Sequence, residues 1–261
     1  MSNIITKAKP VVLETGEKKE WFEKWFDSPY YHVLYKDRDH HEAERFLDRL
    51  IEFIHPAPQS KILDVACGKG RHSTYLNKKG FDVVGYDLSE ESINHNKKFE
   101  NDLLHFYLHD MRETFRSNYF NIAINLFSSF GYFLKERDNI RCLISHATAL
   151  KPGGIFIFDY FNCHKIVNMG EAKLLKQIDN IEFQIHKKII GNIIVKSIDF
   201  KDNNQVHHFE EHVRLMNKAE LEHYFDLAGF KITHVFGNYE LHNFDIYESD
   251  RLIIIATKKA H

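Results

Sequence analysis

Cysteine and metal-binding motifs are scarce or missing in this chain. It has three cysteines in 261 residues, an odd number that is too scattered for a disulfide framework or a zinc site. Cys67, Cys142 and Cys163 are therefore expected to be reduced thiols. The sequence also lacks an HExxH pattern and a Cys/His cluster, so we predict no bound metal.

The chain also lacks the marks of a membrane protein and of a strongly electrostatic nucleic-acid binder. No apolar stretch approaches the roughly 20 residues that span a bilayer. Residues 1–10 have no apolar signal core, so we expect a cytoplasmic location and no membrane partner. The formal net charge is -2 and no dense run of Lys and Arg occurs, which argues against a nucleic-acid partner.

What is present is an ordinary globular composition, with 43% hydrophobic and 28% charged residues in a length that suits one α/β domain. Apolar runs and helical periodicity alternate along the first part of the chain. They predict strands at 61–66, 82–86, 104–109, 120–126 and 155–159, and helices at 43–54, 71–79, 90–100 and 136–150. Such alternation predicts a parallel sheet with helices on both faces and a ligand site at the carboxyl ends of the strands.

The pattern changes after Asn162. Extended segments are predicted at 178–190, 193–201 and 206–214, with hairpin turns at 191–192 and 202–204. These segments predict an antiparallel insertion beside the ligand cleft. A helix at 217–228 and strands at 231–237 and 251–258 then complete the main sheet.

The most informative stretch runs from Lys61 to His72. Its apolar run ends in a loop with Gly68 and Gly70, and helix-forming residues follow, which predicts a strand, a glycine turn and a helix. A second strand ends at Asp87, about twenty residues further on. This layout is typical of a nucleoside cofactor site in which the acid accepts hydrogen bonds from ribose hydroxyls.

Charge indicates which cofactor binds. A dinucleotide fingerprint needs a third glycine where this chain has Ser73, and a neutral pocket for pyrophosphate at the helix N-terminus. Asp64, near the end of the first strand, would repel a diphosphate. It would attract the ammonium of S-adenosylmethionine (SAM), which carries a ribose and a sulfonium but no phosphate. We therefore favour SAM over a nucleotide-dependent oxidoreductase.

The chain resembles the class I SAM-dependent methyltransferases over roughly residues 20 to 258. The resemblance rests on Asp64-Val65-Ala66-Cys67-Gly68-Lys69-Gly70, Gly85-Tyr86-Asp87-Leu88-Ser89 and Leu150-Lys151-Pro152-Gly153-Gly154. It implies an α/β Rossmann-like fold: a seven-stranded mixed sheet with the last strand antiparallel, helices on both faces and an inserted antiparallel β subdomain. The implied organisation is a helical lid region at 1–58, a SAM-binding core at 59–162, the insertion at 163–215, and a C-terminal helix with closing strands at 216–261.

The resemblance also implies the cofactor-binding residues. Asp64 would face the methionine ammonium, Asp87 the ribose, and Leu88 the adenine. The full set of candidates is Asp64, Ala66, Cys67, Gly68, Gly70, Asp87, Leu88, Asp110, Met111, Leu126 and Phe127, joined by Tyr30 and Arg38 from the lid. The alternative is that the acids solvate strand ends or cap helices, and that Leu88 and Phe127 belong to the core.

The segment 28–41 is rich in Tyr and His and precedes the first strand, where related enzymes carry a lid. Trp21, Phe22, Trp25 and Phe26 just before it repeat at helical spacing. Tyr31, His32 and Tyr35 are the candidate catalytic residues of this lid. The alternative is that its aromatics merely cover a sheet. Further candidates near the methyl acceptor are Tyr132, Asp159, Tyr160 and His164.

The predicted activity is transfer of the SAM methyl group to a nitrogen or oxygen of a small molecule, with S-adenosylhomocysteine (SAH) as the product. The fourth strand runs into Asn125-Leu126-Phe127-Ser128 and lacks the Asn/Asp-Pro-Pro-Tyr/Phe motif that is typical of enzymes that methylate the amines of adenine, cytosine or glutamine. An enclosed pocket suits a compact acceptor, and an amine is preferred. The alternatives are an RNA or protein methyltransferase and a non-catalytic SAM/SAH-binding module. A homodimer is left open.

Overall fold

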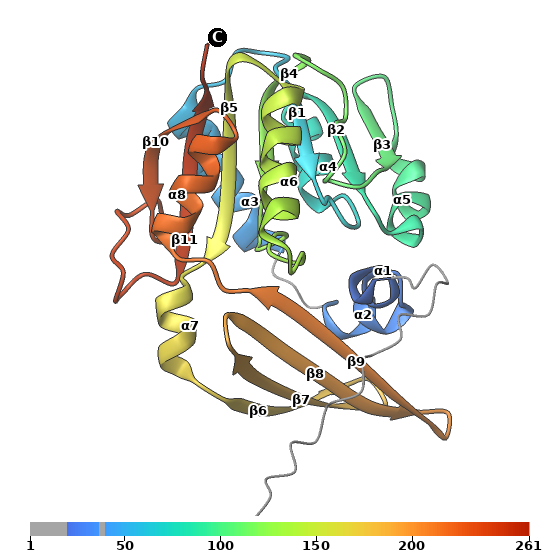
Figure 1. Cartoon of the computed structure of the whole chain (residues 1–261). Coiled ribbons are helices and arrows are strands. Elements are labelled where there is room, and N and C mark those ends of the chain that lie inside the picture. The colour runs from blue at the N-terminus through green and yellow to red at the C-terminus, as the bar shows by residue number, and fades with distance from the viewer. Residues whose placement is uncertain (1–19, 37–39, 261) are drawn as a thin grey trace, which may run out of the picture.

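A seven-stranded sheet forms the centre of the computed structural model, which describes residues 20–36 and 40–260 (Figure 1). The strand order is β10-β11-β5-β4-β1-β2-β3. β11 runs antiparallel to both of its neighbours, as predicted for the last strand. The strands are β1 Lys61–Val65, β2 Asp82–Asp87, β3 Leu104–Leu108, β4 Phe120–Asn125, β5 Leu150–Phe161, β10 Phe230–Phe236 and β11 Arg251–Lys258.

The order of the parallel strands places the site. From β1 the chain continues outward to β2 and β3 on one side, whereas β4 and β5 lie on the other side. Strand order therefore reverses between β1 and β4, where a crevice forms at the carboxyl ends of α/β sheets. In β1, Ile62 to Val65 are all buried, as expected for a central parallel strand covered on both faces.

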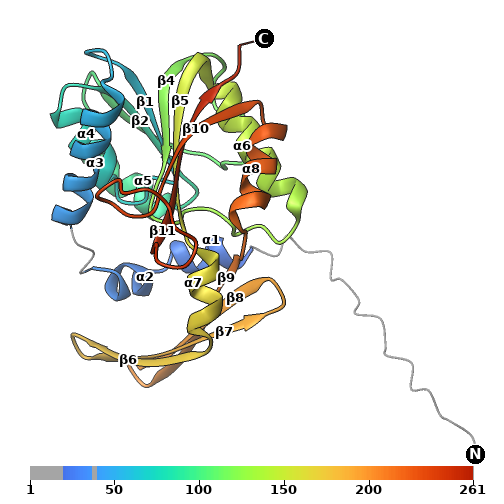
Figure 2. The same ribbon diagram turned by 90° about the vertical axis from the view of Figure 1, so that its left-hand side faces the viewer.

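Helices cover both faces of this sheet (Figure 2). The helices α3 His40–Ile54, α4 Arg71–Lys78 and α5 Glu90–Asn96 contribute to one buried cluster, and α6 Glu136–Ala149 and α8 Lys218–Leu227 contribute to the other. The side chain of Ser89 caps α5 by accepting the Ser92 N–H, and Glu90 and Glu91 follow it in the first turn. The helix predicted at 90–100 changes to a 3₁₀ turn, η1 Lys97–Phe99.

The insertion is a four-stranded antiparallel sheet in the order β6-β7-β8-β9. Its strands are β6 Ala172–Ile178, β7 Ile181–Ile190, β8 Ile193–Asp202 and β9 Gln205–Arg214, and α7 Cys163–Met169 precedes them. The sequence prediction lacked α7 and β6. β6 is an edge strand with Leu174 and Leu175 exposed, and it has no β-branched residue before Ile178. Neither strand propensity nor an alternation of apolar and polar residues therefore predicted β6.

Two short N-terminal helices lie between the two sheets (Figure 1). These are α1 Trp21–Phe26 and α2 Pro29–Leu34. Ser28 caps α2 through its side chain, and Pro29 occupies the first position of the helix. Trp25 and Leu34 share a buried cluster with apolar side chains of the second sheet. Phe22 of α1 belongs instead to the buried cluster of the main sheet, so the N-terminal helices pack against both sheets.

Candidate active site

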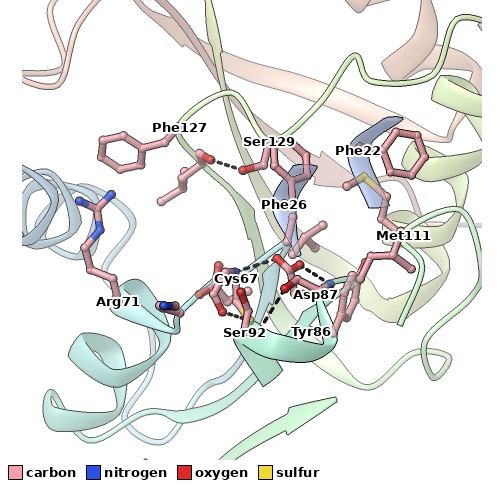
Figure 3. Close-up of a pocket in the computed structure, with 18 of the residues that line it drawn as sticks. Phe22, Phe26, Cys67, Arg71, Tyr86, Asp87, Ser92, Met111, Phe127 and Ser129 are labelled. Carbon is pink, nitrogen blue, oxygen red and sulfur yellow. Dashed lines mark hydrogen bonds between the residues drawn. The ribbon is translucent and has the colours of Figure 1, made fainter. Parts of the chain in front are cut away.

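A cavity of about 360 Å³ lies between the carboxyl ends of β1 to β4 and the helices α1 and α2. Figure 3 shows Arg71 and Phe127 at one end, Met111 and Phe22 at the other, and Asp87 between them. The lining also contains aromatic side chains from the N-terminal helices and from the loop after β4. These aromatics are Phe22, Phe26, Tyr31, Tyr35, Tyr132 and Phe133.

The glycine turn after β1 lines one side of the cavity. Ala66, Gly68 and Gly70 all have positive φ, at 55°, 52° and 71°. Gly68 lines the cavity, whereas Gly70 is the N-cap of α4 and lies outside the lining. A Cβ on Gly70 would lie 2.9 Å from the Phe106 ring. Gly70 therefore allows α4 to start close against β3.

Asp64 faces the cavity from within the sheet. Its carboxyl is 1% exposed and accepts a hydrogen bond of 2.6 Å from the Ser73 hydroxyl. Burial raises the pKa of Asp64 to about 7, because desolvation outweighs the hydrogen bonds from Ser73. A carboxyl in this state is suited to a cationic ligand group, which would restore its charge. The position opposes a diphosphate.

Asp87 ends β2 beside the glycine turn and is half-buried. Its two oxygens accept the N–H groups of Gly68, at 2.8 Å, and Ser89, at 2.9 Å. Burial raises the pKa of Asp87, and these backbone bonds oppose that effect. A carboxylate offers about four acceptor positions, so capacity remains for the hydroxyls of a ribose. Leu88 is 36% exposed and lines the cavity next to it.

Asp110 and Met111 also line the cavity, after β3. The Arg112 guanidinium donates to both carboxylate oxygens of Asp110, at 2.9 to 3.1 Å from Nε. Burial by itself would raise the pKa of Asp110, but the hydrogen bonds from Arg112 prevail and lower it. Arg112 also reaches Glu20, just before α1, at 3.2 Å. Asp110 is thus ionised and already paired, and Met111 supplies an apolar surface.

The opposite end of the cavity is built around Phe127. Its backbone φ is 56°, and its N–H donates to the buried Asp159 carboxylate at 2.7 Å. The Arg71 guanidinium lies 4.7 Å from the centre of the Phe127 ring, and the His72 ring stacks on it at 5.1 Å. Leu126 lines the cavity beside it. Phe127 is therefore part of the cavity wall and is held in a backbone conformation that few side chains adopt.

The lid candidates divide into two groups. Tyr31, His32 and Tyr35 line the cavity, as expected. Tyr30 does not, because its hydroxyl turns to the second sheet and donates to Asp202 at 2.9 Å. Arg38 lies outside the described residues. Within this segment Tyr30 contacts the second sheet, whereas Tyr31 both lines the cavity and packs against the second-sheet cluster.

The candidates near the methyl acceptor also divide into residues that line the cavity and residues that do not. Tyr132 lines the cavity and donates from its hydroxyl to the Ser128 carbonyl at 3.1 Å. Asp159 lies behind the wall, paired with Arg251 at 2.8 Å. Tyr160 is buried and donates to the Arg214 carbonyl, and His164 packs edge-to-face against Tyr247. The structure therefore brings only Tyr132 of this group to the cavity.

Several lining residues were not singled out from the sequence. Phe22 and Phe26 were visible as an aromatic helical face, but nothing in the sequence indicated that this face meets the carboxyl ends of the strands. Arg71 and His72 lie in the stretch that carried the prediction, and their positions directly after Gly70 were the available signal. The remaining unpredicted lining residues include Lys36, Lys69, Ser89, Ser92, His109, Ser129 and Phe133.

Covalent catalysis by cysteine is opposed by the site. Cys67 lines the cavity but is 6% exposed, and burial raises the pKa of its thiol well above the usual value. The neutral thiol is a poor nucleophile. Within residues 20–36 and 40–260 no group of three or more His, Cys, Asp or Glu side chains could hold a metal ion.

The residues present fit SAM. Asp64 would hold the ammonium, Asp87 the ribose hydroxyls, and Leu88 and Met111 the apolar faces of the adenine. The observation that carries this fit is the buried Asp64 carboxyl, which lines the cavity and has the neutral Ser73 hydroxyl as its side-chain hydrogen-bond partner, so a cationic ligand group can pair with it. The cavity volume lies within the usual range of ligand sites, about 300–1,000 Å³.

Comparison with known proteins identifies the class. The methyltransferase domain family matches residues 38–235, more than half of the chain, and the chain belongs to this family. It is a SAM-dependent methyltransferase with the class I fold, which confirms the predicted family, fold, cofactor and activity. No helix within the described segments has both the length and the apolar character needed to cross a membrane.

The chain is similar to several individual proteins. It is 28% identical to the dTDP-3-amino-3,4,6-trideoxy-alpha-D-glucopyranose N,N-dimethyltransferase of Streptomyces venezuelae, over 68% of this chain and 78% of that one. It is 33% identical to the glycine/sarcosine N-methyltransferase of Parasynechococcus marenigrum, over 50% of this chain and 48% of that one. A SAM-dependent methyltransferase from Clostridium acetobutylicum shares the fold, with a TM-score of 0.75 and 20% identity over 88% of this chain and 96% of that one.

Proposed function

We propose that this enzyme transfers the SAM methyl group to an amino nitrogen of a small molecule. The observation that carries the proposal is a set of aromatic side chains from α1, α2 and the loop after β4 that lies over the cofactor residues. We call these side chains the aromatic roof: Phe22, Phe26, Tyr31, Tyr35, Tyr132 and Phe133. A roofed cavity of about 360 Å³ shared with the cofactor leaves room for a compact acceptor. A polymer strand would require an open groove along the surface.

The roof suits an amine. Tyr31, Tyr35 and Tyr132 present ring faces and hydroxyls, and aromatic faces attract amines and their methylated ammonium products through cation–π interactions. The names of the relatives support this substrate class, since both describe N-methyltransferases, one of a sugar amine and one of glycine and sarcosine.

The chain supplies orientation, exclusion of water and a candidate proton acceptor. When bound, SAM supplies a methyl group already activated by its sulfonium, so the main task is to hold the attacking nitrogen in line. The aromatic roof excludes water from that nitrogen. His32 lines the cavity, with Nε2 2.8 Å from the Glu91 carboxylate. Burial, and then the charge of Lys69, lower the pKa of His32, so its ring is neutral near pH 7 and able to accept a proton.

The test is a methyl-incorporation screen with labelled SAM. The panel contains amino sugar nucleotides, glycine and sarcosine, with phenols, RNA and a protein mixture for comparison. Label in an amine product is the expected result. Label confined to a hydroxyl product, RNA or protein would contradict the proposal. Binding of SAM and SAH without transfer to any acceptor would identify a binding module instead.

A further inference from the structure

Three polar side chains from the lid and the second sheet meet at Glu211 of β9. The Trp25 indole N–H of α1 donates to Glu211 Oε1 at 2.7 Å, and the Tyr35 hydroxyl, at the C-cap of α2, donates to the same oxygen at 2.7 Å. Lys196 of β8 lies 3.3 Å from Glu211 Oε2 and also contacts the Tyr35 hydroxyl. We call Trp25, Tyr35, Lys196 and Glu211 the Glu211 centre.

The Glu211 centre is largely shielded from solvent, and sheet register brings two of its members together. Lys196 and Glu211 face each other across β8 and β9 and are only 13% and 14% exposed. An ion pair shielded in this way needs good geometry and hydrogen bonds to its remaining atoms to offset desolvation. Here the indole and the phenol supply those hydrogen bonds. Such a pair holds its partners in one arrangement, whereas an exposed ion pair contributes little.

Only one member of the Glu211 centre reaches the cavity. Tyr35 lines it, whereas Trp25, Lys196 and Glu211 are absent from the lining. The Lys196 ammonium lies 4.6 Å from the centre of the Tyr35 ring, and the Tyr35 and Tyr31 rings are 4.9 Å apart. The centre therefore restrains Tyr35 at its hydroxyl and at its ring, and through it the neighbouring Tyr31.

We propose that Glu211 is a positioning residue for the methyl acceptor, acting through Tyr35. It fixes the part of the roof that faces the acceptor, and its hydrogen-bond and ion-pair partners within the described residues are Trp25, Tyr35 and Lys196. This inference rests on the proposed function, because it assigns the roof to the acceptor. It predicts that loss of Glu211 changes acceptor use and leaves the affinity for SAH nearly unchanged.

The chain offers a matched control for a purely structural role. Tyr30 lies on the same helix as Tyr31, and its hydroxyl also donates to a carboxylate of the second sheet, Asp202, at 2.9 Å. Tyr30 lies outside the cavity lining. If anchoring the lid were the whole effect, Tyr30→Phe and Tyr35→Phe would behave alike.

The experiment compares Glu211→Leu, Glu211→Gln, Tyr35→Phe and Tyr30→Phe in the full chain. Glu211→Leu and Tyr35→Phe should each raise the acceptor KM about tenfold, equivalent to about 1.4 kcal/mol, with a smaller change in kcat. The double variant Glu211→Leu/Tyr35→Phe should have the same acceptor KM as either single variant, because both substitutions break the same hydrogen-bonded unit. Glu211→Gln keeps an oxygen that can accept a hydrogen bond, so it should raise the acceptor KM by less than Glu211→Leu does. Tyr30→Phe should stay within about twofold of the unchanged protein.

Two further measurements make the result decisive. SAH affinity by calorimetry should stay within about twofold in all four variants. Hydrogen exchange of SAH-loaded protein should be faster at α2 in Glu211→Leu and Tyr35→Phe than in Tyr30→Phe. An equal rise in KM for Tyr30→Phe, or unchanged exchange at α2 in Glu211→Leu, would overturn the proposal. Failure of the proposed function shows separately, as absence of turnover in the unchanged protein, and the exchange measurement still tests the positioning role.

Discussion

The two halves of the cavity are built in different ways. On the cofactor side, Asp87 is held by backbone N–H groups of Gly68 and Ser89, which lie 19 and two residues away in sequence. On the side that we propose for the acceptor, Tyr35 is held by the side chain of Glu211, 176 residues away. The first half is a local product of a strand, a turn and a helix. The second half exists only after two distant segments have packed together.

This difference predicts how each half responds to change. In the cofactor half, backbone geometry places the functional groups, so removal of a side chain removes one contact and leaves the frame intact. In the acceptor half, side chains hold one another in place, so removal of one side chain changes the positions of its partners. The four predictions below test this contrast, from the largest expected effect to the smallest.

Asp87→Ala should weaken SAM binding by about 1.5–3 kcal/mol, because the ribose loses hydrogen bonds to a charged group. Calorimetry measures the change. Asp82 at the opposite end of β2 pairs with Lys61 at 3.3 Å, so Asp82→Ala is the matched control and should leave the affinity unchanged. Unchanged affinity in Asp87→Ala would remove Asp87 from the cofactor site.

Gly70→Ala should lower the free energy of unfolding by about 2 kcal/mol, because strain at positive φ adds to a clash of the new Cβ with Phe106. Denaturant unfolding measures this. Gly153 has a nearly equal φ of 73° but no atom within 4 Å of its Cβ position. Gly153→Ala should therefore show only the smaller effect of strain, and equal losses in the two variants would contradict the close packing of the turn on β3.

SAM affinity should rise with pH between about 6 and 7.5, by about tenfold, because of Asp64. The free protein holds this carboxyl with a pKa of about 7, and an ammonium partner requires it ionised. Binding therefore releases a proton below pH 7, and affinity falls as the pH is lowered. Calorimetry in buffers of different ionisation enthalpy measures the proton released. Asp64→Asn should bind more weakly and lose this pH dependence; a slope that persists in Asp64→Asn would assign the effect to another group.

Tyr31→Phe should lower kcat/KM for the acceptor about fivefold, consistent with loss of about 1 kcal/mol from one hydroxyl. SAM affinity should change less than turnover, because Tyr31 lies in the roof above the cofactor residues. Steady-state kinetics with saturating SAM, together with calorimetry, separate the two effects. Equal kinetics in Tyr31→Phe and the unchanged protein would leave Tyr31 as a wall residue without a polar role.

Much of the cofactor half was predictable because its signals are local. The glycine turn, the acid at the end of β2 and the cap at Ser89 each depend on a few consecutive residues. Parallel strands then bring their carboxyl ends to one edge without further information. Gly70 is the exception, since its glycine serves packing against Phe106 and lies outside the cavity lining.

The acceptor half was less predictable for the opposite reason. Tyr30 and Tyr31 are adjacent on one short helix, yet one faces the second sheet and the other the cavity. Asp159 follows the pattern of a strand-end acid, but Arg251 of β11 holds it behind the wall. β6 carried no strand signal, because it forms an exposed edge whose pairing depends on β7.

By itself, the sequence determined the alternating strands and helices of the main sheet, the glycine turn and the acids near the ends of β1 and β2, because hydrophobic periodicity and backbone stereochemistry act over short stretches of chain. Tertiary structure alone decided which aromatic side chains form the roof and which residue, Glu211, holds Tyr35 in it. Those choices depend on contacts between segments far apart in the chain, and their partners become defined only when the insertion packs over the N-terminal helices.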